Sequence, residues 1–133
     1  MPEESLHISQ AKHNKETAKN ILKNNYPFHD WAITCSFYAA LHFFEANLYR
    51  SCATHSEQEA AYYNITPHTY RNNFIMRNHS LIYSKWKELY SASLIARYLT
   101  DISKPAFKYF SINDASELLK KMELIRHHFG YLH

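Results

Sequence analysis

The segment from Asp30 to Tyr49 constrains the fold more than any other part of the sequence. It contains neither glycine nor proline, and its length allows about five turns of α-helix. Such an uninterrupted segment predicts one long helix, against which the other elements must pack.

Two neighbouring stripes of side chains run along this predicted helix at about 100° per residue. The first stripe is apolar and consists of Ile33, Phe37, Ala40, Leu41, Phe44 and Leu48. The second stripe consists of Trp31, Cys35, Tyr38, His42, Glu45 and Tyr49. A helix that is apolar around most of its circumference is covered by several neighbours. We therefore predict a central helix that carries an imidazole and a carboxylate into the interior.

A low content of turn-forming residues extends this prediction to the whole chain. The 133 residues include one glycine and four prolines, which argues against a strand-and-turn architecture. A chain of this length forms one domain with a sizeable core. We predict a single domain over residues 1–133, with an all-α fold: an antiparallel up-and-down bundle of four long helices plus one short helix.

The first helix is predicted to run from Ser5 to Asn24, and Tyr26-Pro27 ends it because the residue before proline is disfavoured in the α region. Asp30 is placed to cap the central helix. The predicted buried face of the first helix consists of Leu6, Ala11, Ala18, Ile21 and Leu22.

The second half of the chain is predicted from turn signals and caps. Thr66-Pro67 is typical of a helix start, and Asn113 or Asp114 is expected to cap the last helix. The predicted elements are a connection over 51–66, a short helix over 67–78, a fourth helix over 80–100, a break at 103–105, an aromatic connection over 107–110 and a last helix ending near Gly130.

Charge and cysteine content limit the partners only loosely. A net charge of +3 permits an anionic partner. A ridge of lysines on the first helix is either a solvated face or a phosphate-binding surface; it consists of Lys12, Lys15, Lys19 and Lys23. Cys35 and Cys52 suggest neither a disulfide framework nor a zinc site. Without a signal peptide or a long apolar run, we expect a cytoplasmic protein with no membrane partner.

Glu45 is the charged residue of the central helix whose burial needs a partner. It shares one sector of the helix with Tyr38 and His42, and a buried carboxylate must be paired or become neutral. The candidate partners are Arg71, Arg97 and His68. We expect Glu45 to be mostly buried and to accept a charge-assisted hydrogen bond from one of the two arginines.

Three interpretations of this polar cluster are open. It is a network that fixes helix packing, or a pocket in which Arg71 and Arg97 hold phosphate while His42 or His68 moves a proton, or a metal site. Helical bundles do build metal sites from Glu and His one turn apart. Because only one such pair is present, neither a metal ligand nor a cofactor is predicted.

The order of these residues resembles a bacterial and archaeal branch of the HEPN superfamily (higher eukaryotes and prokaryotes nucleotide-binding). The resemblance is carried by Asp30-Trp31, the block from Phe37 to His42 with Glu45-Ala46, His55, His68 with Arg71, and Ser93 with Arg97-Tyr98. The block from Trp31 to Glu45 and the Arg97-Tyr98 pair are its most specific parts.

This resemblance implies an up-and-down bundle that is often a homodimer. Members are metal-independent ribonucleases of toxin–antitoxin and defence systems, partners of nucleotidyltransferases, or non-catalytic binders of RNA and nucleotides. The candidate catalytic residues are then His42 and His68. The candidate RNA- or nucleotide-binding residues are Tyr38, Glu45, Arg71, Arg97 and Tyr98.

The ribonuclease members share an arginine followed, after four to six residues, by a histidine. Seven residues separate Arg71 from His79 in this sequence, which is one more than the family pattern. Six residues separate Arg126 from His133, which fits the pattern but ends on the last residue.

The sequence favours two classes of function. The first is a HEPN-like domain that binds RNA or a nucleotide, with or without ribonuclease activity. The second is a non-catalytic protein-interaction module with a structural polar core, for example a partner of a nucleotidyltransferase. A third class, a metal-dependent hydrolase, needs at least three convergent ligands. Convergence of His42, Glu45, Arg71 and Arg97 on an open cleft favours the first class, and closure inside the monomer favours the second.

An aromatic content of 16% also predicts a homodimer through the fourth or last helix.

Overall fold

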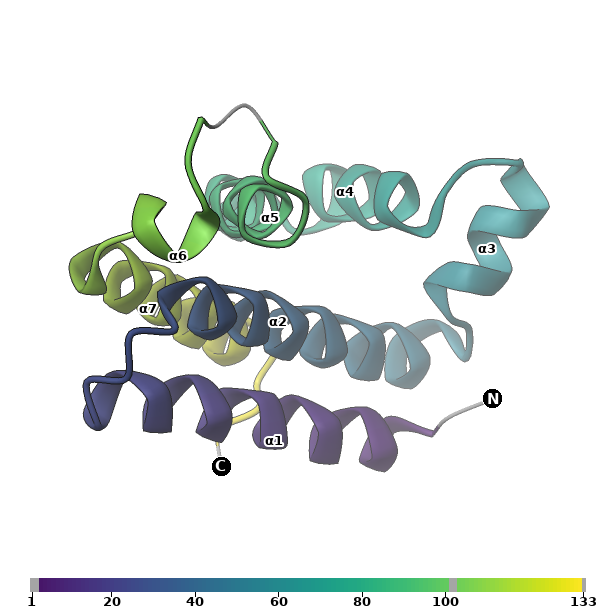
Figure 1. Cartoon of the computed structure of the whole chain (residues 1–133). Coiled ribbons are helices and arrows are strands. Elements are labelled where there is room, and N and C mark those ends of the chain that lie inside the picture. The colour runs from purple at the N-terminus through teal and green to yellow at the C-terminus, as the bar shows by residue number, and fades with distance from the viewer. Residues whose placement is uncertain (1–2, 101–102, 133) are drawn as a thin grey trace.

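The computed structural model describes residues 3–100 and 103–132, and in these residues it contains helices and no β-strand (Figure 1). The prediction of an all-α chain is confirmed. In chain order the elements are α1 Glu4–Lys23, α2 His29–Cys52, α3 Ser56–Tyr63, α4 Pro67–Asn78, the 3₁₀ turn η1 Ser80–Ile82, α5 Tyr83–Tyr98, α6 Ala106–Tyr109 and α7 Ile112–His128.

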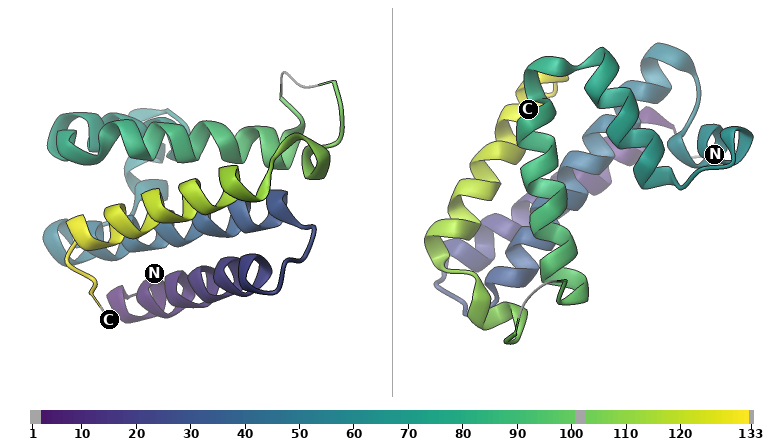
Figure 2. Two further views of the ribbon diagram at one scale, coloured as in Figure 1. Left: turned by 90° about the vertical axis from the view of Figure 1, so that its left-hand side faces the viewer. Right: turned by 90° about the horizontal axis from the view of Figure 1, so that it is seen from above.

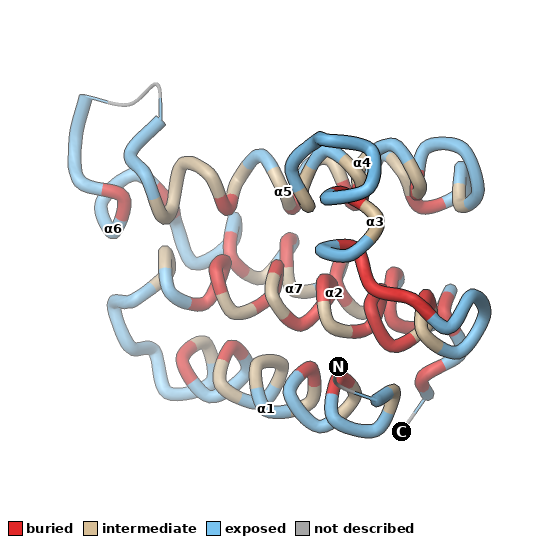
Figure 3. The backbone as a smooth tube through the Cα atoms, turned by 90° about the vertical axis from the view of Figure 1, so that its right-hand side faces the viewer, coloured by how far each residue is buried: buried red, intermediate tan, exposed pale blue. Residues whose placement is uncertain are grey.

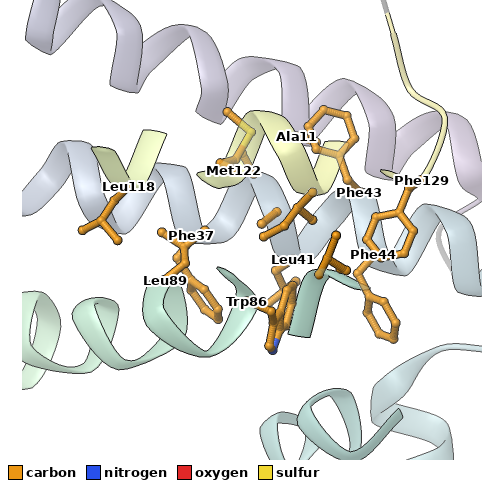
Figure 4. Close-up of a cluster of buried hydrophobic side chains, with 14 of the residues drawn as sticks. Ala11, Phe37, Leu41, Phe43, Phe44, Trp86, Leu89, Leu118, Met122 and Phe129 are labelled. Atoms are coloured by element: carbon orange, nitrogen blue, oxygen red, sulfur yellow. The ribbon is translucent and has the colours of Figure 1, made fainter. Parts of the chain in front are cut away.

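The central helix is α2, as predicted. It packs against α1 on one side and against α5 and α7 on the other, and Figure 2 shows these helices from two further directions. The side chains between them form one hydrophobic cluster, in which Phe37, Phe44, Trp86 and Met122 are fully buried (Figure 4). Because α2 contacts three long helices, almost its whole circumference is covered.

The accessible side of α2 coincides with its second stripe. Trp31 is 61% exposed, Tyr38 and His42 are half-buried, and only Glu45 in this stripe is buried. The small residues on the next side of the helix are buried instead: Ala32, Ser36 and Ala39. The prediction that the second stripe lies in the interior is therefore confirmed at Glu45 and wrong at Trp31, while the rest of the stripe is only partly buried. The reason is that α1 packs along α2 and covers other faces (Figure 3).

A histidine takes the place that a leucine was expected to fill on α1. His7 is buried, whereas Leu6 is 60% exposed. His7 shares a helical face with Ala11 and Ala18, and Leu6 lies about 100° away from it. The predicted face is correct at Ala11, Ala18 and Ile21, but its first member is His7.

Two short helices lie where connections were predicted. α3 occupies half of the segment 51–66, and α6 begins one residue before the aromatic connection and includes three of its residues. Helices this short are marginal by themselves. α3 gains support from α4, against which it packs at one end of the molecule (Figure 1), and from the Glu45 carboxylate, which accepts the Ser56 backbone N–H at 3.1 Å.

The helix starts differ from the predicted caps. α2 begins at His29 with Phe28 as its N-cap and no side-chain cap bond, so the prediction of Asp30 as the cap is wrong. α7 is capped by Ser111, whose hydroxyl accepts the Asp114 backbone N–H while the Asp114 side chain accepts the Ser111 N–H. This reciprocal capping box makes Asp114 the third helical residue and not the cap.

Residues with positive φ explain where the helices end. Gly130, at φ +86°, closes α7 with a hydrogen bond from its N–H to the His127 carbonyl, as predicted for a C-cap glycine. α1 ends before Tyr26-Pro27, because Asn25 already turns at φ +54°. α5 ends at Tyr98, before the predicted break, because Leu99 takes φ +55°. This conformation is strained for a leucine.

Candidate functional site

Glu45 and Arg71 form a buried ion pair between α2 and α4. Glu45 Oε1 accepts a hydrogen bond from Arg71 Nε at 2.9 Å, and the two side chains are 3% and 7% exposed. The second carboxylate oxygen is occupied by the Ser56 backbone N–H. The expectation that Glu45 is buried and bonded to an arginine is confirmed. Because both oxygens are used, this carboxylate fixes the positions of α3 and α4.

A cavity of about 400 Å³ lies beside this ion pair. We call it the histidine cleft. It is formed by α2 and α4 with a contribution from α3, and it is lined by Tyr38, Leu41, His42, Glu57, Pro67, His68 and Arg71. Glu45 itself does not line it. The cleft therefore contains both candidate catalytic histidines, while the carboxylate behind them is out of reach of a ligand.

His42 is held at the cleft by a histidine from α1. His42 Nδ1 lies 3.0 Å from His7 Nδ1, and the two imidazoles share a hydrogen bond. Burial, followed by the proximity of His7, lowers the pKa of His42 to about 4, although Glu45 acts in the opposite direction. Burial also lowers the pKa of His7. Both rings are therefore neutral near pH 7, so His42 differs from the unperturbed imidazole with a near-neutral pKa that was expected at this position.

His68 faces the same cleft from α4. Its ring lies against those of Phe37 and Tyr90, and its Nδ1 is 3.3 Å from Arg71 Nη1. Burial, and then the charge of Arg71, lowers the pKa of His68. An arginine can only donate, so His68 Nδ1 accepts this bond and the neutral ring carries its proton on Nε2.

Arg97 is fixed at the end of α5 by neutral oxygens. Its guanidinium donates to the Ser93 hydroxyl at 3.1 Å and to the Tyr38 hydroxyl at 2.8 Å. It also lies over the rings of Phe37, Tyr38 and Tyr98, with centroid distances of 5.4, 5.2 and 4.9 Å. Among the described residues, no carboxylate lies within ion-pair distance of Arg97.

A second cavity, of about 310 Å³, adjoins Arg97. We call it the tryptophan cleft, and it is lined by Asp30, Trp31, Thr34, Tyr38, Ala96 and Arg97. Tyr38 belongs to both clefts, so the two cavities adjoin along the accessible side of α2. Trp31 presents an exposed indole here, whereas Tyr98 contacts Arg97 but lines neither cavity.

The four residues whose convergence on one cleft was expected to favour RNA or nucleotide binding do not meet in one cavity. His42 and Arg71 line the histidine cleft, Arg97 lines the tryptophan cleft, and Glu45 lines neither. The sequence reasoning missed His7, which contacts His42, and gave Trp31 no role. The helical spacing that places His7 on one face with Ala11 and Ala18 was the available signal for His7.

The arginines of the two candidate arginine–histidine pairs of the ribonuclease pattern make different contacts in the structure. Arg71 bonds Glu45, while His79 is the C-cap of α4 and has its Nδ1 2.9 Å from His128 Nε2. Arg126 is buried and donates to the Tyr131 carbonyl at 2.6 Å, which secures the turn after α7. His133 lies outside the described residues.

The ligand set required by a metal-dependent hydrolase is not found in the part of the chain that the structure describes. No group of three or more His, Cys, Asp or Glu side chains there is arranged to hold a metal ion. Within the same residues, no helix has the length and apolar character needed to cross a membrane.

Comparisons with protein-family models, with curated proteins and with solved structures gave no significant match. The geometry of the two clefts and the resemblance of the motifs are therefore the basis on which a function is proposed.

Proposed function

We propose that the chain binds RNA or a nucleotide in the histidine and tryptophan clefts. The observation that carries this proposal is that the guanidinium of Arg97 is oriented but not neutralised by a described carboxylate. This guanidinium is half-buried, oriented by neutral oxygens and stacked over aromatic rings, and no described carboxylate neutralises it. A guanidinium that is already oriented grips phosphate oxygens at little cost in side-chain entropy.

The exposed indole of Trp31 supplies the second element of such a site. Nucleobases stack on aromatic side chains, and this stacking is tolerant of sequence. A phosphate on Arg97 and a base on Trp31 would occupy the tryptophan cleft, and the sugar or a second phosphate would reach His42 and His68 across Tyr38. Each cleft also contains one carboxylate: Asp30 lines the tryptophan cleft and Glu57 lines the histidine cleft. This negative charge limits the number of phosphates that each cleft accepts.

We further infer that the chain is HEPN-like, with the four long helices α1, α2, α5 and α7 forming the antiparallel bundle implied by the resemblance. In support, the motif residue Arg97 is 59 positions from Tyr38 in the sequence, yet it lines the tryptophan cleft with Trp31 and Tyr38 of α2. This cleft adjoins the histidine cleft, which contains His42. A place in a toxin–antitoxin or defence system is part of this proposal.

The binding test compares wild type with Arg97→Ala and Arg77→Ala. Arg77 is an exposed arginine of α4 outside both clefts and controls for the loss of one positive charge. Fluorescence anisotropy with a labelled single-stranded RNA should show binding that weakens about tenfold in Arg97→Ala and changes little in Arg77→Ala, as expected for one charge-assisted contact. The affinity should also fall with added salt.

Cleavage is assayed on the same RNA in excess chelator. Cleavage by wild type that disappears in His42→Gln, while binding persists, would assign metal-independent ribonuclease activity. Binding without cleavage would assign a non-catalytic binder. Equally weak binding by wild type and both arginine variants would contradict the proposal. It would favour the protein-interaction module. The buried Glu45–Arg71 pair would then be part of the structural core of that module.

A further inference from the structure

The His7–His42 contact has two possible arrangements of its proton. The two Nδ1 atoms lie 3.0 Å apart, so one ring must donate and the other must accept. If His7 donates, neutral His7 carries its proton on Nδ1 and neutral His42 carries its proton on Nε2. If His42 donates, the two tautomers are reversed.

The surroundings of His7 distinguish these arrangements. His7 Nε2 is buried and has no hydrogen-bond partner among the described residues. In the reversed arrangement this nitrogen would be an orphaned N–H in the interior. When His7 donates, it is an unoccupied acceptor. Buried N–H groups without a partner are rarer in proteins than under-used acceptors. The geometry therefore favours donation from His7 to His42.

We infer that His7 is a positioning residue that holds His42 in the tautomer with its proton on Nε2, so that His42 meets a ligand as a neutral hydrogen-bond donor. Arg71 does the same for His68, whose Nδ1 accepts from the guanidinium. The two histidines that line the cleft then both carry their protons on Nε2. This pair suits a ligand rich in acceptor oxygens, such as a phosphate or a base carbonyl. The effect of this histidine pair on ligand binding rests on the proposed function.

The lowered pKa values of His42 and His7 agree with neutral rings. If both rings were charged, they would repel each other at hydrogen-bond distance. His55, whose ring centroid is 5.2 Å from that of His7, acts on His7 in the same direction.

The tautomers can be measured without any ligand. Long-range ¹H–¹⁵N correlation spectra of the labelled full chain distinguish a protonated from a bare ring nitrogen, and spectra of His7→Asn and His42→Gln assign the two rings. We expect His7 protonated on Nδ1 and His42 on Nε2 near neutral pH. The opposite pair of tautomers would overturn the inference, whatever the protein binds.

Two His7 variants test the effect on His42. His7→Asn keeps a donor near the Nδ1 position, whereas His7→Leu removes it at similar volume. We expect His42 to stay in the Nε2–H form in His7→Asn and to show a mixture of both tautomers in His7→Leu. A fixed Nε2–H form in His7→Leu, with the native thermal unfolding midpoint, would overturn the positioning role.

RNA binding separates this inference from the proposed function. In His7→Leu we expect the affinity for the labelled single-stranded RNA to fall in proportion to the fraction of His42 that leaves the Nε2–H form, about twofold for an equal mixture of tautomers. We expect His7→Asn to restore the affinity. The predicted tautomers in a wild type that binds no RNA would support the assignment of the proton and overturn the proposed function. Weak binding by both variants, with His42 tautomers unchanged, would contradict the positioning role.

Discussion

At the scale of single residues, burial decides what the histidines can do. Composition alone gives ten histidines with ordinary pKa values near neutrality. In the structure, burial is the largest cause of the lowered pKa values of His7, His42 and His68. These imidazoles therefore act as neutral hydrogen-bonding groups at neutral pH, and the positive charge beside them comes from Arg71 and Arg97.

The lowered pKa of His42 predicts a loss of stability in mild acid. Its pKa falls from 6.5 to about 4 in the folded chain. Between these values the unfolded chain binds a proton that the folded chain does not, so the free energy of unfolding decreases as pH falls from 6.5 toward 4. Urea unfolding at about pH 7 and about pH 4.5 should show a smaller decrease in His42→Gln than in wild type.

The control for this measurement is His13→Gln, because His13 is an exposed residue of α1. Its decrease in stability should match that of wild type. The same pH dependence in all three proteins would contradict the assignment to His42.

At the scale of elements, local signals explain some helix ends and distant residues explain others. The capping box of α7 lies within four consecutive residues, Ser111 to Asp114, so it is a local signal, although the predicted cap was Asn113 or Asp114. α3 has no side-chain cap from its own N-cap residue. The carboxylate of Glu45 on α2 instead accepts the N–H of Ser56, the first residue of α3, which also suits the positive end of a helix dipole. This explains why the segment 51–66 reads as a connection.

The capping box gives a prediction about stability. Ser111→Ala should lower the free energy of unfolding by about 1 kcal/mol, because it leaves the Asp114 N–H without its acceptor. Ser91→Ala is the matched control, since Ser91 is exposed in the middle of α5 and alanine is the better helix former. Chemical denaturation measures both. Equal unfolding midpoints for the two variants would show that the cap contributes nothing.

At the scale of the whole molecule, the site exists because one side of α2 is left partly open. α1, α5 and α7 cover the remaining faces, and the open side receives side chains from α4 and α5 that form the two clefts. The surface also carries exposed apolar residues on the predicted dimerisation helices. Among them are Tyr98 on α5 and Leu124 on α7, at 65% and 50% exposure.

These exposed residues define a test of the predicted homodimer. Light scattering at micromolar concentration should give about twice the chain mass of 15.8 kDa. Leu124→Glu should reduce the measured mass by placing a charge in the interface, whereas Tyr62→Glu, on the exposed side of α3, should not. A wild-type mass equal to that of one chain would contradict the prediction.

The sequence by itself determined the helical class, the central helix, the start of α4 at Thr66-Pro67, the C-cap at Gly130 and the burial of Glu45 with an arginine. These follow from local spacing, from turn chemistry and from the cost of burying an unpaired carboxylate. Only the tertiary structure decided which stripe of α2 stays accessible, that His7 contacts His42, and that Arg71 and Arg97 line different clefts. It also decided the position of α3. These features depend on contacts between residues far apart in the chain, and helical periodicity gives the face of a residue but not the partner that covers it.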